Sequence, residues 1–184
     1  RVNLPHDPLW PRAASNFSHP REQGSDLTLV GVPANQTSIS PTSAHLTPAA
    51  IRQALLRYSL AHSDSRVDLS RLKLSDSGDV SSPDKDEHKT ITELAAITQK
   101  HRLLVALGGD NSITYSVAKA VAATGLITFD AHYDLRDGVS NGSPVRRLIE
   151  SGLAGKNVVQ IGIADFSNSP QYAERAREFG ITEI

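Results

Sequence analysis

The chain has 184 residues, a formal net charge of -1 and 39% hydrophobic residues, which is enough apolar sequence for one globular domain with its own core. The near-neutral charge gives no electrostatic basis for binding nucleic acid or an anionic membrane. Without cysteine, the chain has no disulfides, zinc ribbons or thiol nucleophiles. No apolar run reaches the roughly 18–20 residues that span a bilayer, and no signal-peptide pattern opens the sequence. We therefore expect a cytoplasmic protein that binds neither nucleic acid nor membrane.

The first 26 residues lack periodicity and contain four prolines, which predicts an irregular N-terminal arm. Residues 27–184 are expected to form a single α/β domain. Within it, 27–32 reads as a buried strand, and a long polar loop follows that strand. Thr47-Pro48 is typical of a helix start, and the helix is expected to run to about residue 62.

The rest of the chain alternates between strand and helix patterns. Further strands are expected at 72–76, 103–107, 126–129 and 158–163, with a turn at 76–79. Further helices are expected at 87–101, 112–123, 143–150 and 169–179. Such alternation predicts a three-layer α/β/α fold around a mainly parallel sheet. The chain has no methionine, and residues 180–184 resemble the beginning of another strand, so we expect a fragment whose sheet is incomplete at the C-terminal end.

Three potential metal ligands directly follow the apolar run at 126–129. Asp130, His132 and Asp134 are spaced so that an extended backbone places all three side chains on one side. Carboxylates favour Mg²⁺ or Mn²⁺, and imidazole favours Mn²⁺, iron or Zn²⁺. The alternative is a polar turn after a buried strand.

A second polar cluster follows the strand predicted at 103–107. Gly108-Gly109 allows the backbone to approach a pocket closely, and Asp110 and Asn111 come next. Because ligands in open α/β sheets bind beyond the carboxyl ends of strands, Asn111 can share a site with the later ligands. Asn111 could instead cap the helix that begins near Ser112. Asp110 could orient a ligand or accept hydrogen bonds within the turn.

Two of these segments, Gly108–Thr114 and Asp130–Arg136, together resemble the motifs of the ureohydrolase superfamily, which includes arginases, agmatinases and formimidoylglutamases. Weaker similarity is found in Val30–Pro33, Thr47–Arg52 and Asp76–Val80. The resemblance extends from about residue 27 to the end of the sequence. It implies an arginase-like fold and a small-molecule amidine or guanidine substrate, in a protein that forms homo-oligomers.

Three features are most similar to the formimidoylglutamase branch. Ser140–Pro144 resembles that branch's Ser-Asn-Gly-Thr-Pro type of segment, and Phe166–Ser169 resembles its Ser-Asn-Ser segment. Asn111 stands where the superfamily more often has a metal-binding histidine, a variation associated with some formimidoylglutamases. The implied reaction is the hydrolysis of N-formimidoyl-L-glutamate to L-glutamate and formamide, in histidine degradation. An agmatinase, another ureohydrolase or a non-catalytic relative is the alternative.

The resemblance also implies a site with two Mn²⁺ ions per subunit. Asp130 would bridge the ions, Asp134 and Asn111 would bind the first, and His132 would bind the second. Asp134 is the candidate catalytic residue, because a carboxylate beside activated water can relay a proton. The superfamily completes this site with a later S-x-D-x-D motif, which the 184 residues do not contain. We therefore expect the chain alone to be inactive.

The resemblance implies that the loop with Asn141 and Ser143 contacts the substrate's amino-acid end, and Arg147 is expected to bind there as well. Ser143 could instead be a plain N-cap. Arginine can bind a carboxylate through two parallel hydrogen bonds, and Arg136 and Arg146 are further candidates for that contact. Each of the three arginines could also be merely solvated.

Overall fold

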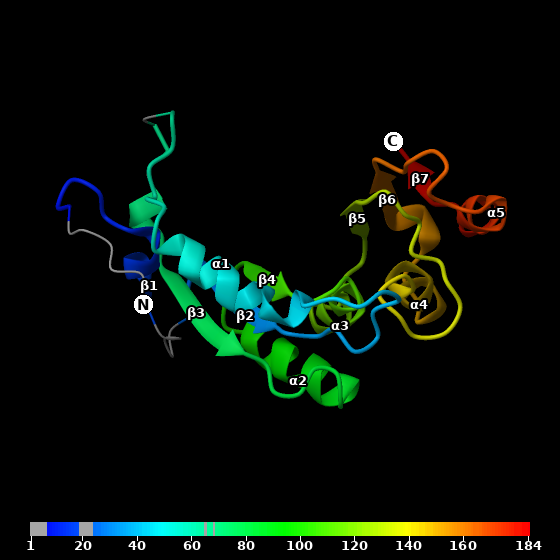
Figure 1. Cartoon of the computed structure of the whole chain (residues 1–184), viewed down its shortest axis with the longest axis horizontal. Helices are drawn as coiled ribbons and strands as arrows, with labels where there is room; N and C mark the ends of the chain where they lie inside the picture. The colour runs from blue at the N-terminus through cyan, green and yellow to red at the C-terminus, as the bar shows by residue number, and fades with distance from the viewer. Residues whose placement is uncertain (1–6, 19–23, 65, 68) are drawn as a thin grey trace.

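The computed structural model describes residues 7–18, 24–64, 66–67 and 69–184. Within these ranges the strands form two sheets in separate parts of the molecule, and every pair of strands is parallel (Figure 1). The first sheet has the order β1-β3-β2-β4, and the second has the order β5-β6-β7. The strands are β1 (Phe17–Ser18), β2 (Leu27–Val32), β3 (Leu74–Asp79), β4 (Leu104–Gly108), β5 (Leu126–Phe129), β6 (Val158–Ile161) and β7 (Thr182–Glu183). The α-helices are α1 (Thr47–Leu55), α2 (Glu87–Thr98), α3 (Ile113–Ala120), α4 (Pro144–Glu150) and α5 (Pro170–Phe179).

Helices cover both faces of the first sheet. Val30 and Val32 of β2 are fully buried in a cluster with Leu94 of α2, and α3 packs against the same cluster. The opposite face of β2 presents Gly31 to Pro48 at the start of α1, so closely that a Cβ on Gly31 would lie 3.0 Å from the proline Cβ. This part of the molecule therefore has the three predicted layers.

The second sheet has helices on one face only. Val158 of β6 packs with Val145 of α4 and Ala176 of α5, and all three side chains are fully buried. On the other face of β5, Ile127 is 65% exposed and Phe129 is 81% exposed. Alternate residues of a strand point to opposite faces, so the whole apolar set on this face lacks a covering layer in the described part of the chain.

The parallel α/β class predicted from the sequence is confirmed, but the strands do not form one sheet. Among the described residues β4 pairs only with β2, and β5 pairs only with β6. No described strand lies between β4 and β5 to join the two sheets, so each of these strands has one edge without a partner. The strand predicted at 126–129 and the further strand expected at the end of the sequence, here β7, are both present.

Some local boundaries differ from those predicted. Residues 76–79 belong to β3 instead of a turn, because they pair with β2 across a shift in register. Helix α1 ends at Leu55, and the carbonyl of Tyr58 then accepts a hydrogen bond from the backbone of Ala13. Part of the predicted arm thus joins the body, and β1 pairs with β3. Residues 1–6 and 19–23 of that arm lie outside the described residues, and the division into an arm and one domain stays a prediction.

No helix in the described ranges is both long enough and apolar enough to cross a membrane.

Candidate metal and substrate site

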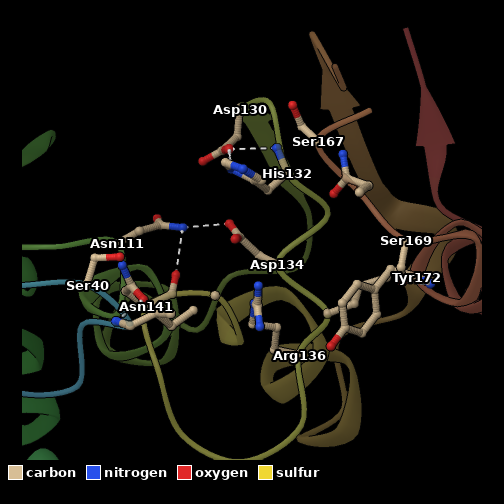
Figure 2. A pocket seen from close by; sticks show the side chains of 14 residues that line it. Ser40, Asn111, Asp130, His132, Asp134, Arg136, Asn141, Ser167, Ser169 and Tyr172 are labelled. Atoms are coloured by element: carbon tan, nitrogen blue, oxygen red, sulfur yellow. Dashed lines mark hydrogen bonds and ion pairs between the residues drawn. The ribbon is translucent and has the colours of Figure 1, made fainter. Parts of the chain in front are cut away.

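The four predicted metal ligands line one pocket of about 420 Å³ (Figure 2). Its walls come from segments that follow the carboxyl ends of β2, β4, β5 and β6, which is where ligands bind in open α/β sheets. The lining side chains shown in Figure 2 include Ser40, Asn111, Asp130, His132, Asp134, Arg136, Asn141, Ser167, Ser169 and Tyr172.

The loop after β4 reaches the pocket because Gly109 lets it press against the loop after β2. A Cβ on Gly109 would lie only 2.5 Å from the carbonyl oxygens of Val32 and Ala34. The backbone N–H of Asp110 donates to the Ala34 carbonyl at 2.9 Å, and the buried Asp110 carboxylate accepts from the N–H of Ser112 at 3.0 Å. Asp110 is therefore the hydrogen-bond acceptor of this turn, and it fixes the residue that follows it.

Asn111 extends from this turn toward Asp134. Its Nδ2 donates to Asp134 Oδ2 at 2.5 Å, and its Oδ1 accepts from the hydroxyl of Thr114 at 2.8 Å. Helix α3 is preceded by Ser112, and the Asn111 side chain accepts no backbone N–H at the helix start. The arrangement favours a role for Asn111 in the pocket over the alternative role as an N-cap.

Residues 130–135, hereafter the ligand loop, are held by two amide side chains of later segments. Asn168 Oδ1 accepts from the N–H of Tyr133 at 3.1 Å, and its Nδ2 donates to the carbonyl of Ala131 at 2.8 Å. Gln160, fully buried in β6, donates to the Tyr133 carbonyl at 3.1 Å. The roles of Asn168 and Gln160 were not predicted from the sequence. Gln160 could have been noticed as a polar residue within a buried strand, and Asn168 as the asparagine of the Ser-Asn-Ser segment.

The predicted ligands lie in two pairs. Asp130 Oδ1 is 3.2 Å from His132 Nδ1; the His132 side chain is exposed and that of Asp130 is partly buried. Asp134 is 7% exposed, adopts a left-handed backbone with φ of 54°, and pairs with Asn111 deeper in the pocket (Figure 2). Among the described residues, no three His, Asp or Glu side chains converge as a ready metal site. The pocket therefore contains the predicted donors in one place, with the two pairs still apart.

The charge distribution of this pocket suits a cation. Burial, together with the charge of the nearby Asp130 carboxylate, raises the pKa of Asp134 to about 7. Removal from water and a like charge both disfavour the ionised carboxylate, and a bound cation would offset both effects. Two carboxylates, an imidazole and an amide are ligands that Mn²⁺ accepts. The donor set therefore fits a divalent metal.

Of the residues predicted to bind substrate, Asn141 lines the pocket. Its carbonyl accepts from Asn111 Nδ2 at 3.3 Å, and its Oδ1 accepts from the N–H of Ile39 at 3.1 Å. Ser143 is fully buried, and its hydroxyl hydrogen-bonds the backbone N–H and carbonyl of Ser140 at 2.9 Å. Ser143 thus holds the loop that carries Asn141, and it is not among the residues that line the pocket.

Arg147 is not among the residues that line this pocket. Its guanidinium makes two hydrogen bonds to Glu87 of α2, at 2.6 and 2.9 Å, and lies 3.7 Å from the ring centroid of Tyr115. This bidentate pair connects α4 to α2 and α3. The side chain is only 14% exposed, so its position is set by packing between helices.

A parallel α/β scaffold with carboxylates, an imidazole and amides beyond its strand ends defines a candidate metal-binding protein. Comparison with known proteins gives the family. Residues 25–184 match the Arginase family, and the chain belongs to that family.

The similar proteins include several formimidoylglutamases. The chain is 40% identical over 169 residues to a formimidoylglutamase of Halalkalibacterium halodurans, covering 83% of this chain and 53% of the relative. The crystal structure of formimidoylglutamase from Bacillus subtilis superposes with a TM-score of 0.90 at 32% identity, over 100% of this chain and 62% of that one. A Trypanosoma cruzi formiminoglutamase crystallised with Mn²⁺ gives 0.84 at 27% identity, over 95% of this chain and 64% of that one. The chain thus spans about half the length of the curated relatives it matches.

Proposed function

We propose that the protein containing this chain is a manganese-dependent hydrolase of N-formimidoyl-L-glutamate, which releases L-glutamate and formamide. The observation that carries the proposal is that Asn111, Asp130, His132 and Asp134 all line one pocket of a fold that superposes on formimidoylglutamase. The 40% identity to a formimidoylglutamase supports this substrate class. Histidine degradation in the cytoplasm is the corresponding process.

Two Mn²⁺ ions per subunit would be held in part by Asp130, His132, Asp134 and Asn111. The metal would supply a water activated at neutral pH. The carboxylate of Asp134, beside this water, is proposed to accept its hydrogen bond and relay a proton during the hydrolysis. In the superfamily, a later motif supplies two further aspartates to this site. The 184 residues do not contain that motif, so we propose that the 184-residue chain alone is inactive.

Of the residues predicted to bind substrate, one is proposed to contact the substrate and two are proposed to hold the surrounding structure in place. Asn141 is proposed to contact the substrate, because it lines the pocket beside Asn111. Ser143 is proposed to fix the loop that carries Asn141, and Arg147 to fix α4 through its pair with Glu87. Assembly into homo-oligomers is proposed from the family resemblance.

The test is turnover of formimidoylglutamate, agmatine, arginine and guanidino acids, measured side by side with added Mn²⁺ on the full-length protein. We expect release of formamide and glutamate from formimidoylglutamate. We expect an Asp130→Asn variant that remains folded to lose most of this activity. Hydrolysis of agmatine without hydrolysis of formimidoylglutamate would assign the protein to the agmatinase alternative. A purified protein that binds no manganese would be a non-catalytic relative.

A further inference from the structure

The pocket is lined by both acidic and basic side chains. Asp130 and Asp134 provide the acidic side, where the cations are proposed to bind. Arg136 is the one arginine or lysine among the described residues that line the pocket, and Figure 2 shows it beside Asp134 and Tyr172. A substrate with an amidine at one end and a carboxylate at the other matches this arrangement.

Three arginines close to the ligand loop could bind a substrate carboxylate, and the structure distinguishes between them. Arg147 is bound to Glu87, as described above. Arg146 donates to the carbonyl oxygens of Arg136 at 2.6 Å and Gly138 at 2.5 Å and also pairs with Glu150, so its guanidinium holds the loop. The guanidinium of Arg136 has no hydrogen bond or ion pair within the described ranges, although it lines the pocket.

Arg136 packs against Gly142. The backbone N–H of Arg136 donates to the Gly142 carbonyl at 3.0 Å. A Cβ on Gly142 would lie 2.9 Å from Arg136 Cδ and 3.0 Å from Ile39 Cδ1, both closer than side-chain contacts normally allow. Glycine at 142 leaves room for the arginine stem, and a larger residue there would make the stem or the Ile39 side chain shift.

We propose that Arg136 binds the substrate's carboxylate and thereby selects anionic amidines over cationic guanidines. Guanidinium groups present paired N–H donors that match a carboxylate, and such charge-assisted hydrogen bonds are among the strongest in proteins. An agmatine-like cation brings no carboxylate to this position and is repelled by the arginine. The proposal rests on the proposed function and names the residue that recognises the carboxylate at the substrate's amino-acid end.

The experiment measures glutamate binding by calorimetry, and steady-state kinetics with formimidoylglutamate, on the full-length manganese-loaded protein. Loss of hydrogen bonds to a charged group predicts glutamate binding about 10- to 150-fold weaker in Arg136→Met. KM should rise by a similar factor, with kcat changed much less. Arg136→Lys keeps the charge without the paired donors, and its affinity should be intermediate. Arg102→Met is the matched control, since Arg102 is 85% exposed and pairs with Asp26 at the opposite ends of the strands.

A second variant tests the positioning by Gly142. Gly142→Ala keeps the charge of Arg136 but displaces its stem, so glutamate affinity should fall while the unfolding midpoint stays close to that of the unchanged protein. Unchanged glutamate affinity in Arg136→Met would refute the inference, and so would a wild-type protein that binds no glutamate. Failure of the proposed function gives a different result, in which wild-type protein hydrolyses agmatine and leaves formimidoylglutamate intact.

Discussion

Replacing Asn168 with alanine should weaken manganese binding without removing any metal ligand. Asn168 makes two hydrogen bonds to the ligand loop, to the N–H of Tyr133 at 3.1 Å and to the carbonyl of Ala131 at 2.8 Å. These two backbone groups flank His132, so the amide fixes the loop that carries the imidazole. Without the Asn168 amide, part of the free energy of metal binding is used to order the loop, so the measured affinity for the metal falls.

The size of the effect follows from those two bonds. Each contributes about 0.5–1.5 kcal/mol net, so the pair contributes about 1–3 kcal/mol. If that energy holds the loop in its ligating form, the dissociation constant for Mn²⁺ rises about 5- to 150-fold. Substitutions of residues that orient metal ligands typically cost about 10- to 100-fold in metal affinity, which is the same range.

The assay is calorimetric titration of Mn²⁺ into metal-free, full-length protein, with circular dichroism to confirm folding. Asn157→Ala is the matched control, because Asn157 makes one similar bond, to the carbonyl of Thr124 at 2.8 Å, before β6 instead of after it. We expect near-normal affinity in this control. Normal manganese affinity in a folded Asn168→Ala protein would refute the reasoning that this amide orders the ligand loop.

Two further predictions concern stability and association. Burial, with the charge of Lys100, lowers the pKa of His101, so the native state favours the neutral ring. Because the unfolded chain then binds more protons, the free energy of unfolding should decrease as the pH falls through about 6.5 and below, and urea titrations of wild type and His101→Gln should differ there. A pH-independent difference would contradict this. The exposed face with Ile127 and Phe129 should make the isolated 184-residue chain self-associate. Light scattering should show smaller particles after both residues are replaced by threonine, which keeps the strand propensity. A wild-type chain that stays monomeric would rule this out.

Most of the elements could be predicted from the sequence because their signals are local. The continuous apolar runs at 103–107 and 126–129 are strands in the structure, and the Pro-initiated helices at 144 and 170 begin where the sequence predicts them. The predictions were wrong where the boundary of an element depends on a neighbouring strand that is distant in the sequence. Residues 76–79 carry turn-forming residues, yet pairing with β2 places them in a strand. Pairing energy from an adjacent strand outweighed the local preference.

The candidate site also combines features that are visible in the local sequence with features that depend on long-range contacts. Spacing along the chain was sufficient to select Asp130, His132 and Asp134, because alternate residues of an extended segment share one side. It could not show that Asn168 holds their loop, since that contact joins segments 37 residues apart. The proposed metal donors can therefore be selected from the sequence alone.

Tertiary structure decided which arginine faces the pocket and how the strands are divided into sheets. The choice among the arginines depends on Glu87, 60 residues before Arg147, and on the space left by Gly142 beside Arg136. Neither is visible in the local pattern, because a guanidinium binds whichever partner the fold brings within reach. Likewise, alternation of strands and helices predicts parallel pairing but does not specify which strands are neighbours. Only the hydrogen-bonded registers show that β4 and β5 belong to separate sheets, with the pocket formed by the loops that follow them.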